Sequence, residues 1–444
     1  MTSFRPVAAL LALSILPAVA PAADDVAALR AELQALKSDY NTRVDALETR
    51  IQQLEAAPAQ VAQTEPAPPP PAPAGGGANA FNPSISLILG GSYTSTSRNP
   101  GDWNIGGFPP SGGDVGPGDR SFNLGESELT VAANIDPYFY GVLTASITGD
   151  DRIAAEEAFI RTTALSDGFT AKFGRFFSGF GYLNEVHSHA WDFVDQPLVY
   201  QALFGGQYKQ NGVQVKWLAP TDLFVEFGAE VGNGDGFPAT RKAANGFNGA
   251  TLFAHVGGDI GDYTSWRVGG SYLTQKAEDR PGGIADEAGE PLFDSFTGNS
   301  RTWVVDGVLK WAPSPRQQLK VQGEYMQRHE SGNIAEGSLL LADDYRSTLS
   351  GWYLQSVYQF APRWRVGARY DSLDSGTPRY TLAPDGLLSS NPDRLSVMLD
   401  WNPSEFSRLR AQYDFDNARD EGERDHILRL QYIYGIGAHG AHKY

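Results

Sequence analysis

Two histidines separated by one residue are the clearest candidates for chemistry in this sequence. His187 and His189 are flanked by Glu185 and Asp192. In an extended segment, side chains two residues apart point the same way, so two imidazoles and a carboxylate could bind a divalent metal ion. The alternative is that these polar side chains form hydrogen bonds that hold a loop in place. We favour this alternative, because two histidines without a third fixed ligand are common by chance.

The motifs of several enzyme classes are missing from the sequence. There is no Gly-x-Ser-x-Gly nucleophile elbow, no phosphate-binding loop and no dinucleotide fingerprint. His329-Glu330 lacks the second histidine of the H-E-x-x-H zinc motif. Because the chain has no cysteine, thiol catalysis, zinc–thiolate sites and disulfides are excluded. We therefore expect no enzymatic activity and no cofactor.

The first 80 residues divide into three segments that precede the main fold. Arg5 is followed by an apolar run to Val19 and then by small residues, which predicts a signal peptide over 1–22. Over 24–55, apolar residues recur at steps of three and four, which predicts a coiled-coil oligomerisation segment. A lone amphipathic helix is the alternative. Residues 56–80 are rich in Pro, Ala and Gly, which is typical of a linker.

From residue 81 to residue 444, short segments carry an apolar side chain at every second position. Examples are Leu143, Ala145 and Ile147; Trp303, Val305, Gly307, Leu309 and Trp311; and Leu395, Val397, Leu399 and Trp401. A period of two is typical of β-strands with one apolar face and one wet face. No apolar run after the N-terminus approaches the roughly 20 residues that a membrane-spanning helix needs.

Tight turns recur among these segments. They contain Asp136-Pro137, Ser166-Asp167-Gly168, Ala219-Pro220-Thr221-Asp222, Gly261-Asp262, Pro313-Ser314-Pro315, Ala361-Pro362-Arg363 and Asn402-Pro403-Ser404. Between the turns lie mostly long, Gly-rich and acidic loops. Short turns at one end and long loops at the other are typical of an outer-membrane β-barrel. Seven short turns with eight outer connections give 16 strands.

We therefore predict an all-β fold, a transmembrane antiparallel β-barrel of about 16 strands over 81–444. An N-terminal periplasmic α-helical coiled coil precedes it, because an even strand number puts both termini on the periplasmic side. Trp217, Trp311 and Trp401 adjoin short turns, where aromatic rings meet the membrane interface. The alternative, a soluble β-sandwich, would have to be very large. The expected location is the Gram-negative outer membrane.

The charge and the last strand bear on the partners of the protein. The net charge of −17 argues against binding nucleic acid. Residues 426–434 resemble the aromatic-rich C-terminal insertion signal of outer-membrane barrels, which implies recognition by the barrel-assembly machinery. We expect contact with outer-membrane lipid and lipopolysaccharide. In one hypothesis the coiled coil also contacts peptidoglycan.

Three groups of segments carry a family resemblance. They are 156–160 with 170–176 and 179–181; 191–198 with 211–215; and 351–358 with 364–371 and 399–403. Together they resemble the phosphate-selective porins of Gram-negative outer membranes, over most of 120–436. The resemblance implies a sixteen-stranded homotrimeric barrel whose third loop, 179–210, folds inward. Selectivity in that family rests on Lys and Arg lining the pore, whereas the segment 182–205 has neither residue.

Strand alternation and this resemblance select the residues expected to line the pore. The candidates for the pore lining and constriction are Glu126, Glu128, Glu157, Arg161, Arg175, Glu185, Asp192, Asp195, Arg369 and Asp371. Lys172 and Arg175 are three residues apart, so a regular strand points only one of them inward. Charges of both signs suit a water-filled channel with a transverse field. The alternative is that they pair with each other and keep the wall rigid.

These observations favour a porin through which small hydrophilic solutes or ions diffuse passively. A second hypothesis is a substrate-specific uptake channel for a metal, a metal chelate or a siderophore, with His187 and His189 in the binding role. A third is a structural tether of the cell envelope, in which the coiled coil and the linker reach peptidoglycan.

Overall fold

A computed structural model describes Gln34 and most of the chain after residue 82. The described ranges are 83–112, 115–149, 152–240, 245–282, 295–336, 341–379, 390–419 and 424–437. The chain divides into two compact units, 1–77 and 78–444. Apart from Gln34, which is helical and exposed, the predicted signal peptide, coiled coil and linker lie outside the described residues. All of the described strands belong to the second unit.

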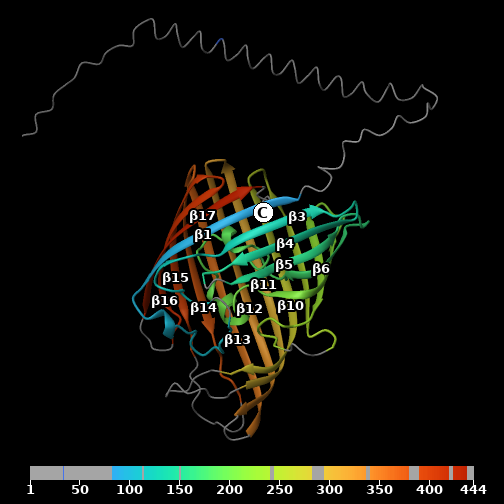
Figure 1. Cartoon of the computed structure of the whole chain (residues 1–444), viewed down its shortest axis with the longest axis vertical. Helices are drawn as coiled ribbons and strands as arrows, with labels where there is room; N and C mark the ends of the chain where they lie inside the picture. Colours follow the sequence, from blue (N-terminus) through green and yellow to red (C-terminus); the bar gives the residue numbers. More distant parts are fainter. Residues whose placement is uncertain are drawn as a thin grey trace, which may run out of the picture. The chain divides into compact units, whose positions relative to one another are not determined.

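Antiparallel strands form one closed sheet in the second unit (Figure 1). The strands are β1 Ser84–Thr96, β2 Ser121–Asn123, β3 Ser127–Asn134, β4 Phe139–Ile147, β5 Ile153–Thr162, β6 Phe169–Phe177, β7 Lys209–Leu218, β8 Phe224–Gly232, β9 Gly249–Ile260, β10 Thr264–Pro281, β11 Ser295–Ser314, β12 Gln317–Glu336, β13 Leu341–Ala361, β14 Trp364–Asp374, β15 Asp393–Ser404, β16 Ser407–Asn417 and β17 Asp425–Gly437. The helical elements are the 3-10 helices η2 Pro100–Asp102 and η3 Ser188–Ala190 and the α-helix α2 Leu198–Phe204.

The barrel wall has 16 strand positions, because β2 and β3 together occupy one of them. β2 and β3 both pair with β1, in successive registers, and are separated by residues 124–126. β1 lies between β17 and β3, which closes the sheet (Figure 1). Ser86 pairs with Gly437, so β1 begins where β17 ends. The prediction of a 16-stranded antiparallel barrel is confirmed.

At the end of the barrel where β1 begins and β17 ends, the connections are the short turns that the sequence predicts. They span 135–138, 163–168, 219–223, 261–263, 315–316, 362–363 and 405–406. In three of them the strand continues further than expected, since β11 reaches Ser314, β13 reaches Ala361 and β15 reaches Ser404. Shifts of register after Trp311 and Trp401 accommodate the extra residues of β11 and β15 as β-bulges.

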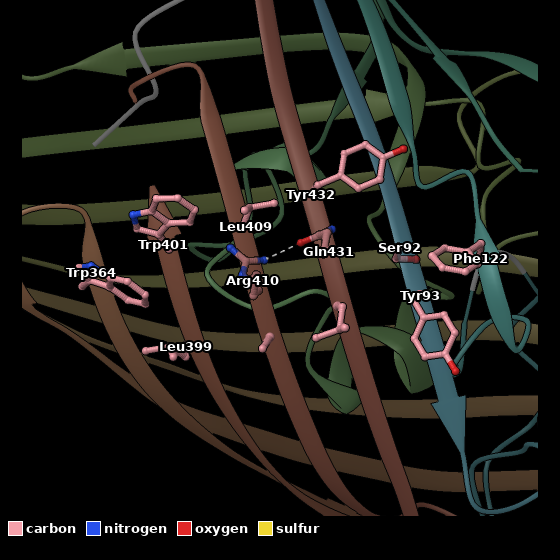
Figure 2. Close-up of a pocket in the computed structure, with 12 residues that line it drawn as sticks. Ser92, Tyr93, Phe122, Trp364, Leu399, Trp401, Leu409, Arg410, Gln431 and Tyr432 are labelled. Carbon is pink, nitrogen blue, oxygen red and sulfur yellow. Dashed lines mark hydrogen bonds between the residues drawn. The ribbon is translucent and has the colours of Figure 1, made fainter. Parts of the chain in front are cut away.

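The outer surface of the barrel is apolar, as strand alternation predicts. Along β11, Trp303, Val305 and Leu309 are exposed. On the outside of β14–β17, β1 and β2, aromatic and aliphatic side chains line a groove of about 560 Å³ (Figure 2). One position from Leu409, Arg410 is buried and hydrogen-bonded to Gln431 at 3.1 Å. Apolar outside and polar inside is the arrangement of a barrel that faces lipid.

An apolar cluster forms inside the barrel as well. All seven residues of α2 are buried, and they pack with Phe180 and Tyr208 against inner-wall residues such as Met326 and Tyr353. Gly205 ends the helix at φ 67°, where a Cβ would lie 2.7 Å from the carbonyl oxygen of Ser111. Among the described residues, no helix is long and apolar enough to cross a membrane.

The outer face gives a test of the membrane orientation. Val305 is 61% exposed between two tryptophans of β11, and Tyr263 is 57% exposed in a short turn. Val305→Arg should cost up to about 2–4 kcal/mol of unfolding free energy in lipid, because it places a charge on the lipid-facing surface between the two tryptophans, whereas Tyr263→Arg should cost about 0–1 kcal/mol. Denaturant unfolding from lipid vesicles measures both. Equal costs would contradict a lipid-facing outer surface.

Candidate functional site

The segment between β6 and β7, residues 178–208, lies against the inside of the barrel, and we call it the inner loop. Two wall carboxylates hold its first residues. Glu230 of β8 accepts hydrogen bonds from Ser178 Oγ at 2.5 Å and from the backbone N–H of Gly179 at 2.8 Å. Glu324 of β12 accepts the backbone N–H of Leu183 at 3.0 Å. The loop therefore turns inward as soon as β6 ends.

Further along the loop, the chain contacts the wall near β6 and β7. Glu185 lies 3.1 Å from Lys216 Nζ and 3.8 Å from Lys172 Nζ. Lys216 also lies 3.6 Å from Glu226, which is 3.2 Å from Nδ1 of His255. A buried ammonium group is costly unless anions lie close to it. This row of alternating charges supplies those anions to Lys216.

The two candidate histidines face β3 and β5. His187 Nδ1 lies 3.2 Å from Glu128 Oε2 and 3.4 Å from Glu156 Oε2, and Nε2 lies 3.1 Å from Glu157 Oε2. His189 Nδ1 lies 2.9 Å from Glu128 Oε1. Burial lowers the pKa of His187, but the surrounding carboxylates outweigh burial and raise its pKa well above the ordinary value.

A β-bulge brings two consecutive glutamates to this histidine. Thr144 pairs with Glu157 and Ala145 with Ala155, so Glu156 is an extra residue in β5. The bulge breaks the alternation that would otherwise point only one of the two carboxylates inward. Sequence parity selected Glu157 and missed Glu156 for this reason.

The following part of the loop crosses to the opposite wall. Asp192 lies 2.5 Å from Lys320 of β12 and 2.9 Å from Arg365 of β14. Burial alone would raise the pKa of Asp192, but these two cations and Arg408 hold it well below its usual range. The Asp192 carboxylate is therefore charged at neutral pH.

Asp195 of the loop is paired with three arginines. It lies 2.8 Å from Arg394, 2.9 Å from Arg369 and 3.4 Å from Arg429, which belong to β15, β14 and β17. Burial would raise the pKa of Asp195, but the three guanidinium groups outweigh it and hold the pKa far below its usual range. Arg369 also pairs with Asp371 at 3.0 Å.

Of the other predicted residues, Glu126 adjoins the inner loop, beside Ser188 and close to Glu156. Glu126 lies in the connection between β2 and β3, half-buried, and Arg161 of β5 lies over the ring of Tyr140. Arg175 pairs in the ladder with Ala158 and has the parity of the exposed Phe173. Buried Lys172 has the opposite parity. Lys172 thus lies inside the barrel, where it contacts Glu185, and strand alternation places half-buried Arg175 on the other face of β6.

The cations around the crossing are more exposed than the carboxylates that they pair with. The side chains of Arg267, Lys320 and Arg365 are 25%, 28% and 20% exposed. Their partners Asp306, Asp192 and Asp400 are 0%, 6% and 0% exposed. We call Arg267, Lys320, Arg365 and Arg408 the cationic strip. In each of these pairs the cation is more exposed than its carboxylate.

Comparison with solved structures defines the class of fold. The chain is similar to OmpT of Vibrio cholerae, an outer membrane protein, with loop L8 deleted: the TM-score is 0.50 and the identity 11%, over 81% of this chain and 100% of that one. The trimer form of in-vitro folded OmpT matches with a TM-score of 0.50 and 9% identity, over 80% of this chain and 99% of that one. At this identity the likeness establishes an outer-membrane β-barrel fold.

A sequence relative defines the family. No family model matches the chain. An uncharacterized protein of Aquifex aeolicus (strain VF5) is 32% identical over 397 residues, which cover 82% of this chain and 80% of the relative. The chain belongs to the same family as that protein.

The triple pairing of Asp195 gives a test of how the inner loop is held. Asp195→Asn should cost about 3–5 kcal/mol of unfolding free energy, because three buried guanidinium groups lose their shared counter-charge. Asp262→Asn makes the same change at an exposed turn and should stay within about 0.5 kcal/mol of the parent. Denaturant unfolding in detergent measures both. An Asp195→Asn variant as stable as the control would refute the anchoring role.

Proposed function

We propose that the protein is a porin through which small hydrophilic solutes diffuse passively across the outer membrane. The observation that carries this proposal is the attachment of the inner loop to both sides of the barrel interior. Glu185 and His187 contact β3, β5, β6 and β7, whereas Asp192 and Asp195 contact β12, β14, β15 and β17. A loop that is held on opposite walls narrows the passage and sets its size limit.

We further propose that the passage favours small anions. The cationic strip presents more charge to water than the carboxylates behind it, and a low-dielectric wall concentrates that field in the channel. The phosphate-selective porins that the sequence resembles rely on Lys and Arg in the pore; here the barrel wall would supply these residues, because the segment 182–205 has none. The mechanism is size exclusion together with electrostatic attraction, and it needs neither an enzyme activity nor a cofactor.

The setting of this channel is also part of the proposal. The exposed apolar outer face supports insertion in the outer membrane, in contact with lipid and lipopolysaccharide, after delivery by the barrel-assembly machinery. Since β1 begins at the short-turn end of the barrel, residues 1–82 would belong to the periplasmic side. There the segment 24–55 would support a homotrimer and could reach peptidoglycan.

Single-channel recording of the purified protein in planar bilayers tests the anion preference. The reversal potential in a KCl gradient should correspond to a chloride-to-potassium permeability ratio above one. Lys320→Gln should lower this ratio roughly two- to threefold, because a unit charge ~7 Å from the ion path is worth ~0.6 kcal/mol in water and about half of that in 0.1 M salt.

Lys276→Gln is the matched control. Lys276 is exposed near the end of β10 that lies opposite the short turns, so its loss should leave the ratio unchanged. A parent protein that prefers potassium, or equal effects of the two substitutions, would refute the anion preference. An absence of conductance would refute the proposed channel itself.

A further inference from the structure

One nitrogen of His187 lies between two carboxylates without a hydrogen bond to either. Nδ1 is 3.2 Å from Glu128 Oε2 and 3.4 Å from Glu156 Oε2, yet it makes no hydrogen bond of acceptable geometry. Glu156 Oε2 is also buried without a hydrogen-bond partner, and the residue is only 5% exposed. An N–H donor would point at one carboxylate oxygen. Nδ1 instead lies close to both oxygens and forms a hydrogen bond with neither.

The spacing of these atoms suits a metal ion. The three ligand atoms of His187, Glu128 and Glu156 all lie within 4.8 Å of one another. In a tetrahedral site with bonds of ~2.1 Å, neighbouring ligand atoms are about 3.4 Å apart. The two distances from Nδ1, 3.2 Å and 3.4 Å, match this edge. Imidazole nitrogen with carboxylate oxygen is a donor set for zinc and similar divalent ions.

Neighbouring side chains hold these ligand atoms in place through hydrogen bonds. Nε2 of His187 lies 3.1 Å from Glu157 Oε2, and a carboxylate only accepts, so Nε2 is the donor of this hydrogen bond. A metal ion at Nδ1 would displace the proton from that nitrogen and use its lone pair. A histidine that binds a metal usually donates its other N–H to a carboxylate in this way. The second oxygen of Glu128 accepts from Ser188 Oγ at 3.1 Å and from His189 Nδ1 at 2.9 Å.

We propose that Glu128, Glu156 and His187 bind one divalent transition-metal ion, such as Zn²⁺, which fastens the inner loop to the barrel wall. The ligands come from β3, β5 and the loop, so the ion would join three segments. His189, which the sequence suggested as a ligand, would support Glu128 instead. This proposal does not depend on which solute passes the channel.

The burial of the ligands indicates a resident ion rather than a transported one. Glu128 and Glu156 are 2% and 5% exposed, and the side chain of His187 is 24% exposed. Between the two glutamate strands, β4 presents the buried small side chains of Thr144 and Ser146, which leave room for the loop. Within the described part of the chain, the ion pairs of Glu128 and Glu156 are all to histidine. No lysine or arginine pair competes with a metal there.

Zinc binding to the full chain in detergent tests this site. The protein is prepared without a histidine tag, treated with a chelator and titrated with ZnCl₂ by calorimetry, and the bound zinc per chain is measured after dialysis. The parent should bind one ion at this site. His187→Gln should weaken that binding at least 100-fold, because the glutamine amide can still donate to Glu157 but has no atom in place of Nδ1. Glu156→Gln should also weaken it.

The matched control is His255→Gln, which changes another buried histidine that lies beside a single glutamate. It should bind zinc as the parent does. His439 and His442 could bind zinc independently, but such binding would persist in His187→Gln. A parent that binds no zinc, or a His187→Gln variant that retains all of it, would overturn the proposal. An anomalous-scattering peak among the three ligands would place the ion directly.

Discussion

Charge complementarity between the inner loop and the barrel wall is the interaction on which the interior depends. The loop has no lysine or arginine from 182 to 205, and its acidic residues meet cations on both walls. The wall around Asp195 carries Arg369, Arg394 and Arg429, which would repel one another without a shared carboxylate. The loop is acidic, unlike a basic pore lining. Its position against a basic wall explains this composition.

The loop combines two kinds of packing with different roles. Around α2, apolar side chains fill the space against β10–β14, and burial of this surface stabilises the loop without fixing its charges. Between 185 and 196 the carboxylates make polar, directional contacts, each with partners at defined distances. An ion pair adds little stability relative to apolar packing, but the loss of one partner is strongly destabilising. The polar part therefore specifies where the loop lies.

Most of the barrel could be predicted from sequence because its signals are local. Alternation and tight turns gave the strand number, the short-turn end and the wet face without knowledge of distant contacts. The site could be predicted only in part. Glu156 depends on a bulge, and Arg175 depends on which of two parities β6 adopts. Glu230 and Glu324 look like any other polar strand residue until the loop that they hold is present.

The bulge in β5 has a consequence for how relatives diverge. The ladder pairs on either side of Glu156, Thr144 with Glu157 and Ala145 with Ala155, would be continuous if that one residue were absent. A single-codon insertion or deletion can therefore add or remove this carboxylate while the strands of the barrel keep their register. Family members can differ here in length rather than in residue type, and an alignment that forbids gaps within strands would hide the difference.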